Sequence, residues 1–138
     1  MKREILIFRH FPTEGPGYFA RFLDRQGIPH RTIKIDEGEP VPESIADIPG
    51  LVLMGGPMSV NDPLPWIPKV LRLIRQAVAA DIPVLGHCLG GQLLSKALGG
   101  RVRGNRAKEF GWLPVTAVDS ALTSTWLNGL PPHFEVFH

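Results

Sequence analysis

Short apolar runs alternate along this chain with segments whose apolar residues recur at helical spacing. Three runs are apolar almost throughout, as in strands buried on both faces, and a fourth alternates: residues 4–8, 50–54, 83–86 and 30–36. Helical patterns fill the intervening segments: residues 18–26, residues 66–81 and the segment that ends at residue 98. This order predicts an α/β fold with an open, mostly parallel sheet and helices on both faces.

Beyond residue 100 the pattern is more typical of β-structure. We expect strands at residues 101–103, at 112–118 and from 135 onwards, and a short helix at 121–127. No internal repeat and no shift in composition divides the chain. We therefore expect a single domain over residues 1–138.

The composition excludes several classes of protein. Hydrophobic residues make up 43% and charged residues 20% of the 138, which is typical of a globular chain rather than a disordered one. No apolar run approaches the roughly 18 residues of a membrane span. The first apolar run is also too short for a signal peptide, so we expect a cytoplasmic protein without a membrane partner. The single cysteine cannot form an internal disulfide.

Charged residues gather in two segments of opposite sign. Residues 36–47 carry five acids and no Lys or Arg, and residues 96–108 carry five bases and no acid. Such segments are either solvated loops or a docking surface for a charged partner. No aromatic residue interrupts the basic segment, so we expect no nucleic-acid partner. The sequence has neither a phosphate-binding loop nor a cluster of metal ligands, so we expect no cofactor and no metal.

Cys88 stands between an apolar strand and a helix, with a glycine two residues away on each side, Gly86 and Gly90. This is the arrangement of a nucleophile elbow, with cysteine in place of serine. Both flanks need glycine because the sharp turn brings backbones together where a Cβ would clash. The N-terminus of the following helix adds partial positive charge, which favours a thiolate. We therefore interpret Cys88 as a nucleophile rather than a structural cysteine.

A thiolate that attacks a carbonyl needs hydrogen-bond donors for the oxyanion that develops. The N–H of Leu89, at the start of the helix, is one expected donor. Gly55 and Gly56 follow another apolar strand, and parallel strands end at the same edge of a sheet, where ligands bind. Since glycine lets a backbone N–H face a cavity, we expect the second donor to be Gly56.

Residues 53–60 and 83–94 resemble the class I glutamine amidotransferases, above all the stand-alone group similar to the amidotransferase part of GMP synthase. Residues 108–115 and 134–138, with His10 and Glu14, fit the same pattern, so the resemblance covers essentially the whole chain. It implies a flavodoxin-like, three-layer fold. It also implies hydrolysis of the side-chain amide of L-glutamine through a cysteine thioester, with ammonia passed to an acceptor.

The resemblance also implies roles for individual residues. Cys88 would be the nucleophile, Gly56 and Leu89 would form the oxyanion hole, and Gln92 would contact the substrate glutamine beside Gly55. The position of Gln92, one helical turn past Cys88, agrees with this role because it shares a helix face with the nucleophile. The alternative interpretation of Gln92 is a solvent-exposed or capping residue.

The chemistry further requires a histidine as general base. His87 precedes the nucleophile, so we expect its side chain to point away from the cavity. His10 ends the first strand at the expected edge, and His138 would lie near Cys88 if its strand were parallel to the others. His10 and His138 are the two candidate bases.

The resemblance implies that the catalytic histidine and glutamate form a His-x-Glu pair on a later strand, and we expect that pair to be missing from this chain. We interpret residues 134–138 as the start of a substrate-binding loop and the chain as the N-terminal part of a longer domain, inactive by itself. The alternative is a natural short form that is completed by dimerisation or performs no catalysis.

The expected partners follow from the same resemblance. They are L-glutamine, a synthase that uses the ammonia, and a second copy of the chain at an exposed sheet edge. Two other functions stay open at this point. One is a cysteine hydrolase of the γ-glutamyl peptidase kind, and the other is a non-catalytic interaction domain that uses the basic segment.

Overall fold

Four parallel strands form the sheet that the apolar runs predict. In the computed structural model, which describes residues 3–138, they lie in the order β2-β1-β3-β4. Their bounds are β1 (Ile5–Arg9), β2 (His30–Lys34), β3 (Leu51–Leu53) and β4 (Val84–Gly86). Leu6 faces Leu51 across β1 and β3, and Leu53 faces Gly86 across β3 and β4. The order is that of the flavodoxin-like folds, with its switch point between β1 and β3, so the predicted fold class is confirmed.

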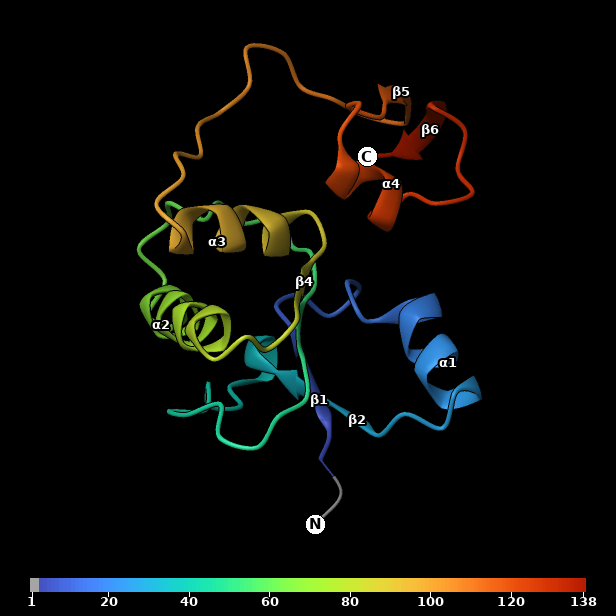
Figure 1. Ribbon diagram of the computed structural model, residues 1–138. Helices are drawn as coiled ribbons and strands as arrows, with labels where there is room; N and C mark the ends of the chain where they lie inside the picture. The colour runs from blue at the N-terminus through green and yellow to red at the C-terminus, as the bar shows by residue number, and fades with distance from the viewer. Residues whose placement is uncertain (1–2) are drawn as a thin grey trace. The chain divides into compact units, whose positions relative to one another are not determined.

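Helices cover both faces of this sheet (Figure 1). Their bounds are α1 (Gly17–Arg25), α2 (Trp66–Ala79) and α3 (Leu89–Ala97). Alternate side chains of the strands point to opposite faces. Ile7 and Val52 pack with Leu23 of α1, while Phe8 and Leu53 belong to the larger cluster with α2 and α3. Within the described residues, no helix is both long enough and apolar enough to cross a membrane.

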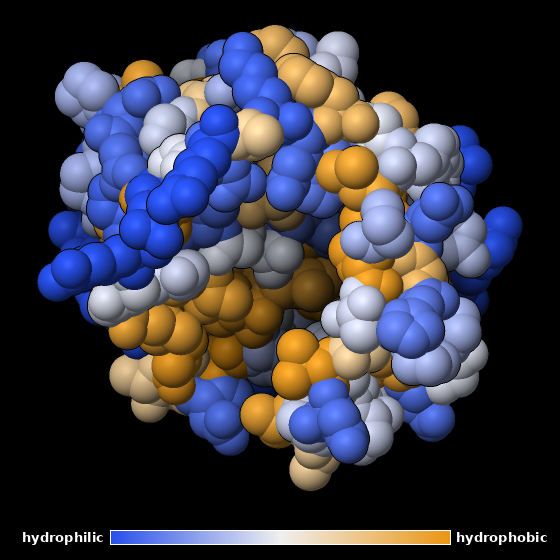
Figure 2. Space-filling model, turned by 90° about the horizontal axis from the view of Figure 1, so that it is seen from above, coloured by the Kyte–Doolittle hydropathy of each residue, from blue (hydrophilic) through white to orange (hydrophobic). Residues whose placement is uncertain are grey.

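Residues 103–138 form a second compact unit, separate from residues 1–102. It contains β5 (Trp112–Thr116), α4 (Ala121–Trp126) and β6 (His133–Phe137), and the two strands pair antiparallel. The hydroxyl of Ser120 caps α4 by accepting a hydrogen bond from the N–H of Thr123 at 3.1 Å. Several large apolar side chains of this unit are exposed, among them Trp112 and Phe137. Figure 2 shows one face of the molecule, where hydrophobic residues lie among hydrophilic ones.

Two sequence-based expectations about elements are wrong. Residues 101–103 do not form a strand; instead the Val102 carbonyl accepts a hydrogen bond from the Asn61 side chain at 2.9 Å. The strand expected at 30–36 ends at Lys34, because its partner β1 ends at Arg9, and the one-turn helix η1 (Ile35–Glu37) follows. The last strand, β6, pairs antiparallel with β5, so the condition under which His138 would lie near Cys88, a strand parallel to the others, is not met.

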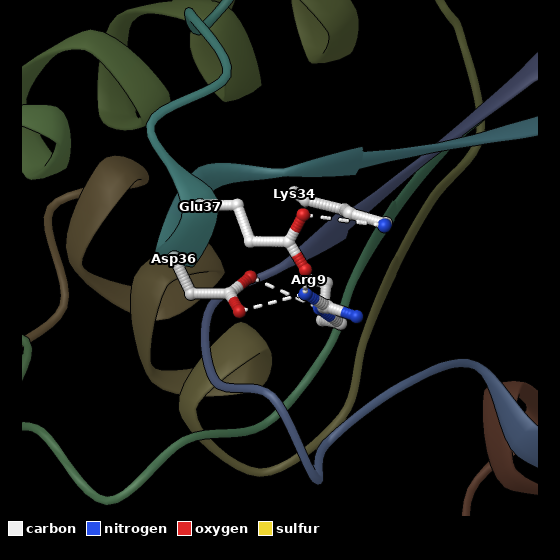
Figure 3. Close-up of polar contacts among 4 residues, drawn as sticks. All are labelled: Arg9, Lys34, Asp36 and Glu37. Atoms are coloured by element: carbon white, nitrogen blue, oxygen red, sulfur yellow. Dashed lines mark hydrogen bonds and ion pairs between the residues drawn. The ribbon is translucent and has the colours of Figure 1, made fainter.

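The first acids of the acidic segment are paired with a base from β1 (Figure 3). Arg9 donates two hydrogen bonds to the Asp36 carboxylate, at 3.0 and 2.8 Å, and also binds Glu37, which Lys34 approaches to 3.2 Å. The bonds from Arg9 lower the pKa of Asp36, and the same contacts raise the pKa of Arg9. Part of the acidic segment therefore fastens the end of β1 to the turn after β2 and is not free for a charged partner.

Candidate active site

Cys88 caps the N-terminus of α3, two residues beyond β4, and its side chain is exposed. Its backbone has φ 50° and ψ −111°, outside the regions that residues with a Cβ normally adopt. Such a conformation costs about 1–3 kcal/mol and persists only where the surrounding structure imposes it. The strained strand-to-helix turn is the local geometry of a nucleophile elbow.

The two flanking glycines make this turn possible, because each lies where a Cβ would collide with neighbouring backbone. A Cβ on Gly86 would lie 2.5 Å from the carbonyl carbon of Gly90, and a Cβ on Gly90 would overlap the backbone carbonyl of Leu53. That carbonyl already accepts a hydrogen bond from the N–H of His87 at 2.9 Å. The predicted clash of a Cβ at either flank is confirmed. The absence of a Cβ at both positions lets the elbow pack closely against the end of β3.

The glycine loop after β3 runs beside the elbow. A Cβ on Gly55 would lie 3.7 Å from the Cβ of Cys88, and a Cβ on Gly56 would lie 3.2 Å from the Leu89 side chain. Within residues 3–138, the N–H groups of Gly56 and Leu89 have no hydrogen-bond acceptor. The structure thus brings Cys88 and two free backbone donors to one edge of the sheet.

His10 is buried behind this loop, with 2% of its surface exposed. Its Nδ1 lies 3.0 Å from the Met54 carbonyl oxygen, so Nδ1 carries the proton and donates. The ring stacks on Trp66 with centroids 4.8 Å apart, and Nε2 has no partner within the described residues. Burial lowers the pKa of His10. These contacts make His10 a support for the peptide that leads into Gly55.

The far end of the same loop is fastened to α3. Lys96, in the last turn of the helix, donates hydrogen bonds to the Val60 carbonyl and to the Asn61 side-chain oxygen, both at 2.9 Å. Lys96 therefore does not belong to a freely solvated basic surface. It ties the segment that follows Gly56 to the helix that begins at Cys88.

The other predicted site residues have simpler surroundings. Gln92 is exposed, and its N–H donates to the Cys88 carbonyl at 3.1 Å, so it lies one turn along the helix from Cys88. His87 faces α1, where its ring lies edge-on to Phe19 with centroids 6.2 Å apart. There it lines a cavity of about 450 Å³ with Tyr18 and Phe22, and Cys88 is not among the residues of that cavity.

The second unit holds the remaining histidines of interest. The backbone of His138 pairs with Gly111, and its Nδ1 lies 3.6 Å from a Glu109 carboxylate oxygen. A tripeptide of the form His-x-Glu, which we expected to be missing, does occur at residues 133–135. It lies in β6, where His133 Nδ1 is 3.1 Å from the Thr116 hydroxyl.

Sequence reasoning assigned no role to Glu14, which the structure brings to the elbow. Its Oε2 lies 2.9 Å from the point where a Cβ on Gly55 would stand, so Glu14 and Cys88 flank the same small volume. Its position in the loop after β1 is a signal that places it at the binding edge of the sheet. The contact with Gly55 itself depends on the folding of two distant loops.

The chain is similar in sequence to known glutamine amidotransferases. The family model described as glutamine amidotransferase class-I matches residues 20–138. A glutamine amidotransferase-like protein of Salmonella typhimurium is 31% identical over 118 residues, which are 82% of this chain and 49% of that protein. A glutamine-hydrolysing GMP synthase of Aeropyrum pernix is 33% identical over 118 residues, which are 86% of this chain and 22% of that enzyme.

Solved structures are similar over nearly the whole chain. The crystal structure of a glutamine amidotransferase from Methylobacillus flagellatus has a TM-score of 0.91 and 44% identity, covering 99% of this chain and 54% of that one. This chain therefore spans about half the length of its stand-alone relatives and about a fifth of the GMP synthase. From its sequence and its fold, the chain belongs to the class I glutamine amidotransferase family.

Proposed function

We propose that this chain carries the nucleophile and oxyanion hole of a glutamine amidotransferase. The observation that supports this most directly is the strained backbone of Cys88 beside two unpaired N–H groups, those of Gly56 and Leu89. A structural cysteine needs neither feature. In a serine protease, removing one donor of the oxyanion hole costs about 2.7–4 kcal/mol of transition-state stabilisation.

The reaction would proceed through a thioester. The thiolate of Cys88 attacks the amide carbon of glutamine, and the carbonyl electrons move to an oxyanion that accepts hydrogen bonds from Gly56 and Leu89. The C–N bond then breaks, and the nitrogen takes up a proton and leaves as ammonia. Water attacks the thioester, so that glutamate departs and the thiol is restored. Gln92 would orient the substrate from the next turn of α3.

The proton transfers need a base. His10 is a poor match because its Nδ1 is occupied by Met54 and its ring is packed against Trp66. We therefore expect negligible glutamine turnover from these 138 residues alone. Robust turnover that is lost in His138→Asn or His133→Asn would assign the base to the second unit. The ammonia acceptor would be a synthase, as the names of the GMP synthase relatives suggest.

Labelling of Cys88 tests the proposal without requiring the base. A chloromethyl ketone analogue of glutamine should alkylate the thiol with saturation kinetics, and L-glutamine should slow the reaction. Intact-mass spectrometry follows the adduct, and because the chain has one cysteine, the part of the labelling that Cys88→Ser abolishes reports this site. The proposal would be contradicted if the alkylation rate rose linearly with the concentration of the glutamine analogue, as it should for iodoacetamide, instead of reaching a plateau. Better protection by γ-glutamyl peptides than by glutamine would indicate a peptidase instead.

A further inference from the structure

Glu14 places a carboxylate beside the nucleophile at the mouth of the elbow. A methyl group added to Gly55 would touch both Glu14 Oε2, at 2.9 Å, and the Cβ of Cys88, at 3.7 Å. Glu14 comes from the loop after β1, whose backbone turns there through a 3.0 Å hydrogen bond from the Glu14 N–H to the Phe11 carbonyl. Two loops that are far apart in sequence thus bring one acid to the reacting end of α3.

This carboxylate has no counter-charge in the structure. The ion pairs of residues 3–138 use other acids, namely Glu4, Asp24, Asp36, Glu37, Asp47 and Glu109. A second negative charge next to an attacking thiolate is unfavourable, since the two repel each other. A cationic group that binds beside the Glu14 carboxylate and the thiolate would offset this repulsion.

We propose that Glu14 binds the cationic α-amino group of the substrate and so selects amides of α-amino acids. The proposal rests on the function proposed above. In glutamine the α-amino nitrogen is four bonds, or roughly 5 Å, from the amide carbon. A substrate whose amide carbon meets Cys88 therefore brings its ammonium group within reach of a carboxylate that flanks the same volume. The contact would be a charge-assisted hydrogen bond.

The test compares two electrophiles that differ only in this group. One is the chloromethyl ketone analogue of glutamine, and the other is its desamino form, in which hydrogen replaces the ammonium. Each rate is divided by the rate with a free thiol in solution. Because both reagents need the same thiolate, the ratio of the two rates cancels any change in how much thiolate is present.

We expect the native chain to prefer the amino reagent by roughly tenfold, the effect of one hydrogen bond to a charged group. In Glu14→Gln the ratio of the two corrected labelling rates should fall to about one. The rate with the desamino reagent should change much less than the rate with the amino reagent. The matched control is Glu43→Gln, which removes one exposed negative charge from the loop that leads to β3 and should keep the preference.

Two results would overturn the proposal. One is an unchanged preference in Glu14→Gln, and the other is an equal loss in Glu43→Gln, which would make it an effect of net charge. Failure of the underlying function looks different. In that case neither electrophile would label the native chain with saturation, and glutamine would protect against neither.

Discussion

The two units of this chain differ most in what they bury. Among the described residues, every buried side chain lies between Leu6 and Ala97, whereas residues 103–138 contain none. The first unit has a parallel sheet with helices on both faces, and the second has a two-stranded ribbon with one short helix. A lone two-stranded ribbon is at best marginally stable in water. Cys88, Gly56 and Leu89 thus lie in the unit that has a core.

The largest expected difference comes from removing a matched phenylalanine in each unit. Phe8 is fully buried in the sheet, whereas 69% of Phe137 is exposed. Phe8→Ala should lower the free energy of unfolding by about 3–5 kcal/mol, and Phe137→Ala should lower it by less than about 1 kcal/mol. Urea denaturation followed by far-ultraviolet circular dichroism measures both. Equal losses would show that the second unit contributes a comparable core.

A smaller difference is expected from two glycine substitutions. A Cβ on Gly90 would meet the Leu53 backbone, while nothing lies within 4 Å of one on Gly104. Gly90→Ala should therefore cost about 1–3 kcal/mol, since the crowded backbones have to move apart. Gly104→Ala should change stability by no more than about 0.5 kcal/mol. Thermal denaturation compares the two variants.

The Gly90 prediction also has a readout at the site. If the elbow positions Cys88 as described, Gly90→Ala should slow labelling by the glutamine chloroketone more than labelling by iodoacetamide. A Gly90→Ala variant with native stability and native labelling would contradict the close approach between α3 and β3.

The smallest expected effect depends on pH and arises at His10. Burial lowers its pKa in the folded state, so below the ordinary value of 6.5 the unfolded state takes up more protons than the folded state. Stability should accordingly fall as the pH falls below about 6.5. In His10→Asn the fall between pH 7.5 and 5 should be shallower. Urea midpoints across this range measure it, and an equal change in His133→Asn, a substitution in the second unit, would contradict the assignment.

Local sequence was enough to predict the parts of the site that one segment builds. The elbow follows from Gly86, Cys88 and Gly90, because the spacing of two glycines around one residue already dictates the crowding. The glycine loop could be placed next to it because parallel strands share an edge. The expected chemistry came from the resemblance to a known family, and the family model confirms that the chain belongs to this family.

Packing between distant segments decided what the sequence did not predict. The apolar pattern of residues 66–81 predicts Leu71 and Val78 for the buried face of the helix, but in α2 the structure buries Leu73 and Ala77 and leaves 44% of Val78 exposed. Successive helix residues point about 100° apart, so which residues beside the central stripe are buried depends on how the helix is rotated against the sheet, and the pattern does not predict that rotation. The burial of His10 likewise depends on Trp66, far along the chain.

The contacts of Lys96 have a consequence for motion at the site. Helix α3 begins next to Cys88, and Lys96 in its last turn also binds the segment after Gly56 at Val60 and Asn61. A displacement of the helix would therefore carry the thiol and part of its neighbouring loop in the same direction. The distance between the thiol of Cys88 and the N–H of Gly56 should accordingly change little during small rigid-body movements of α3.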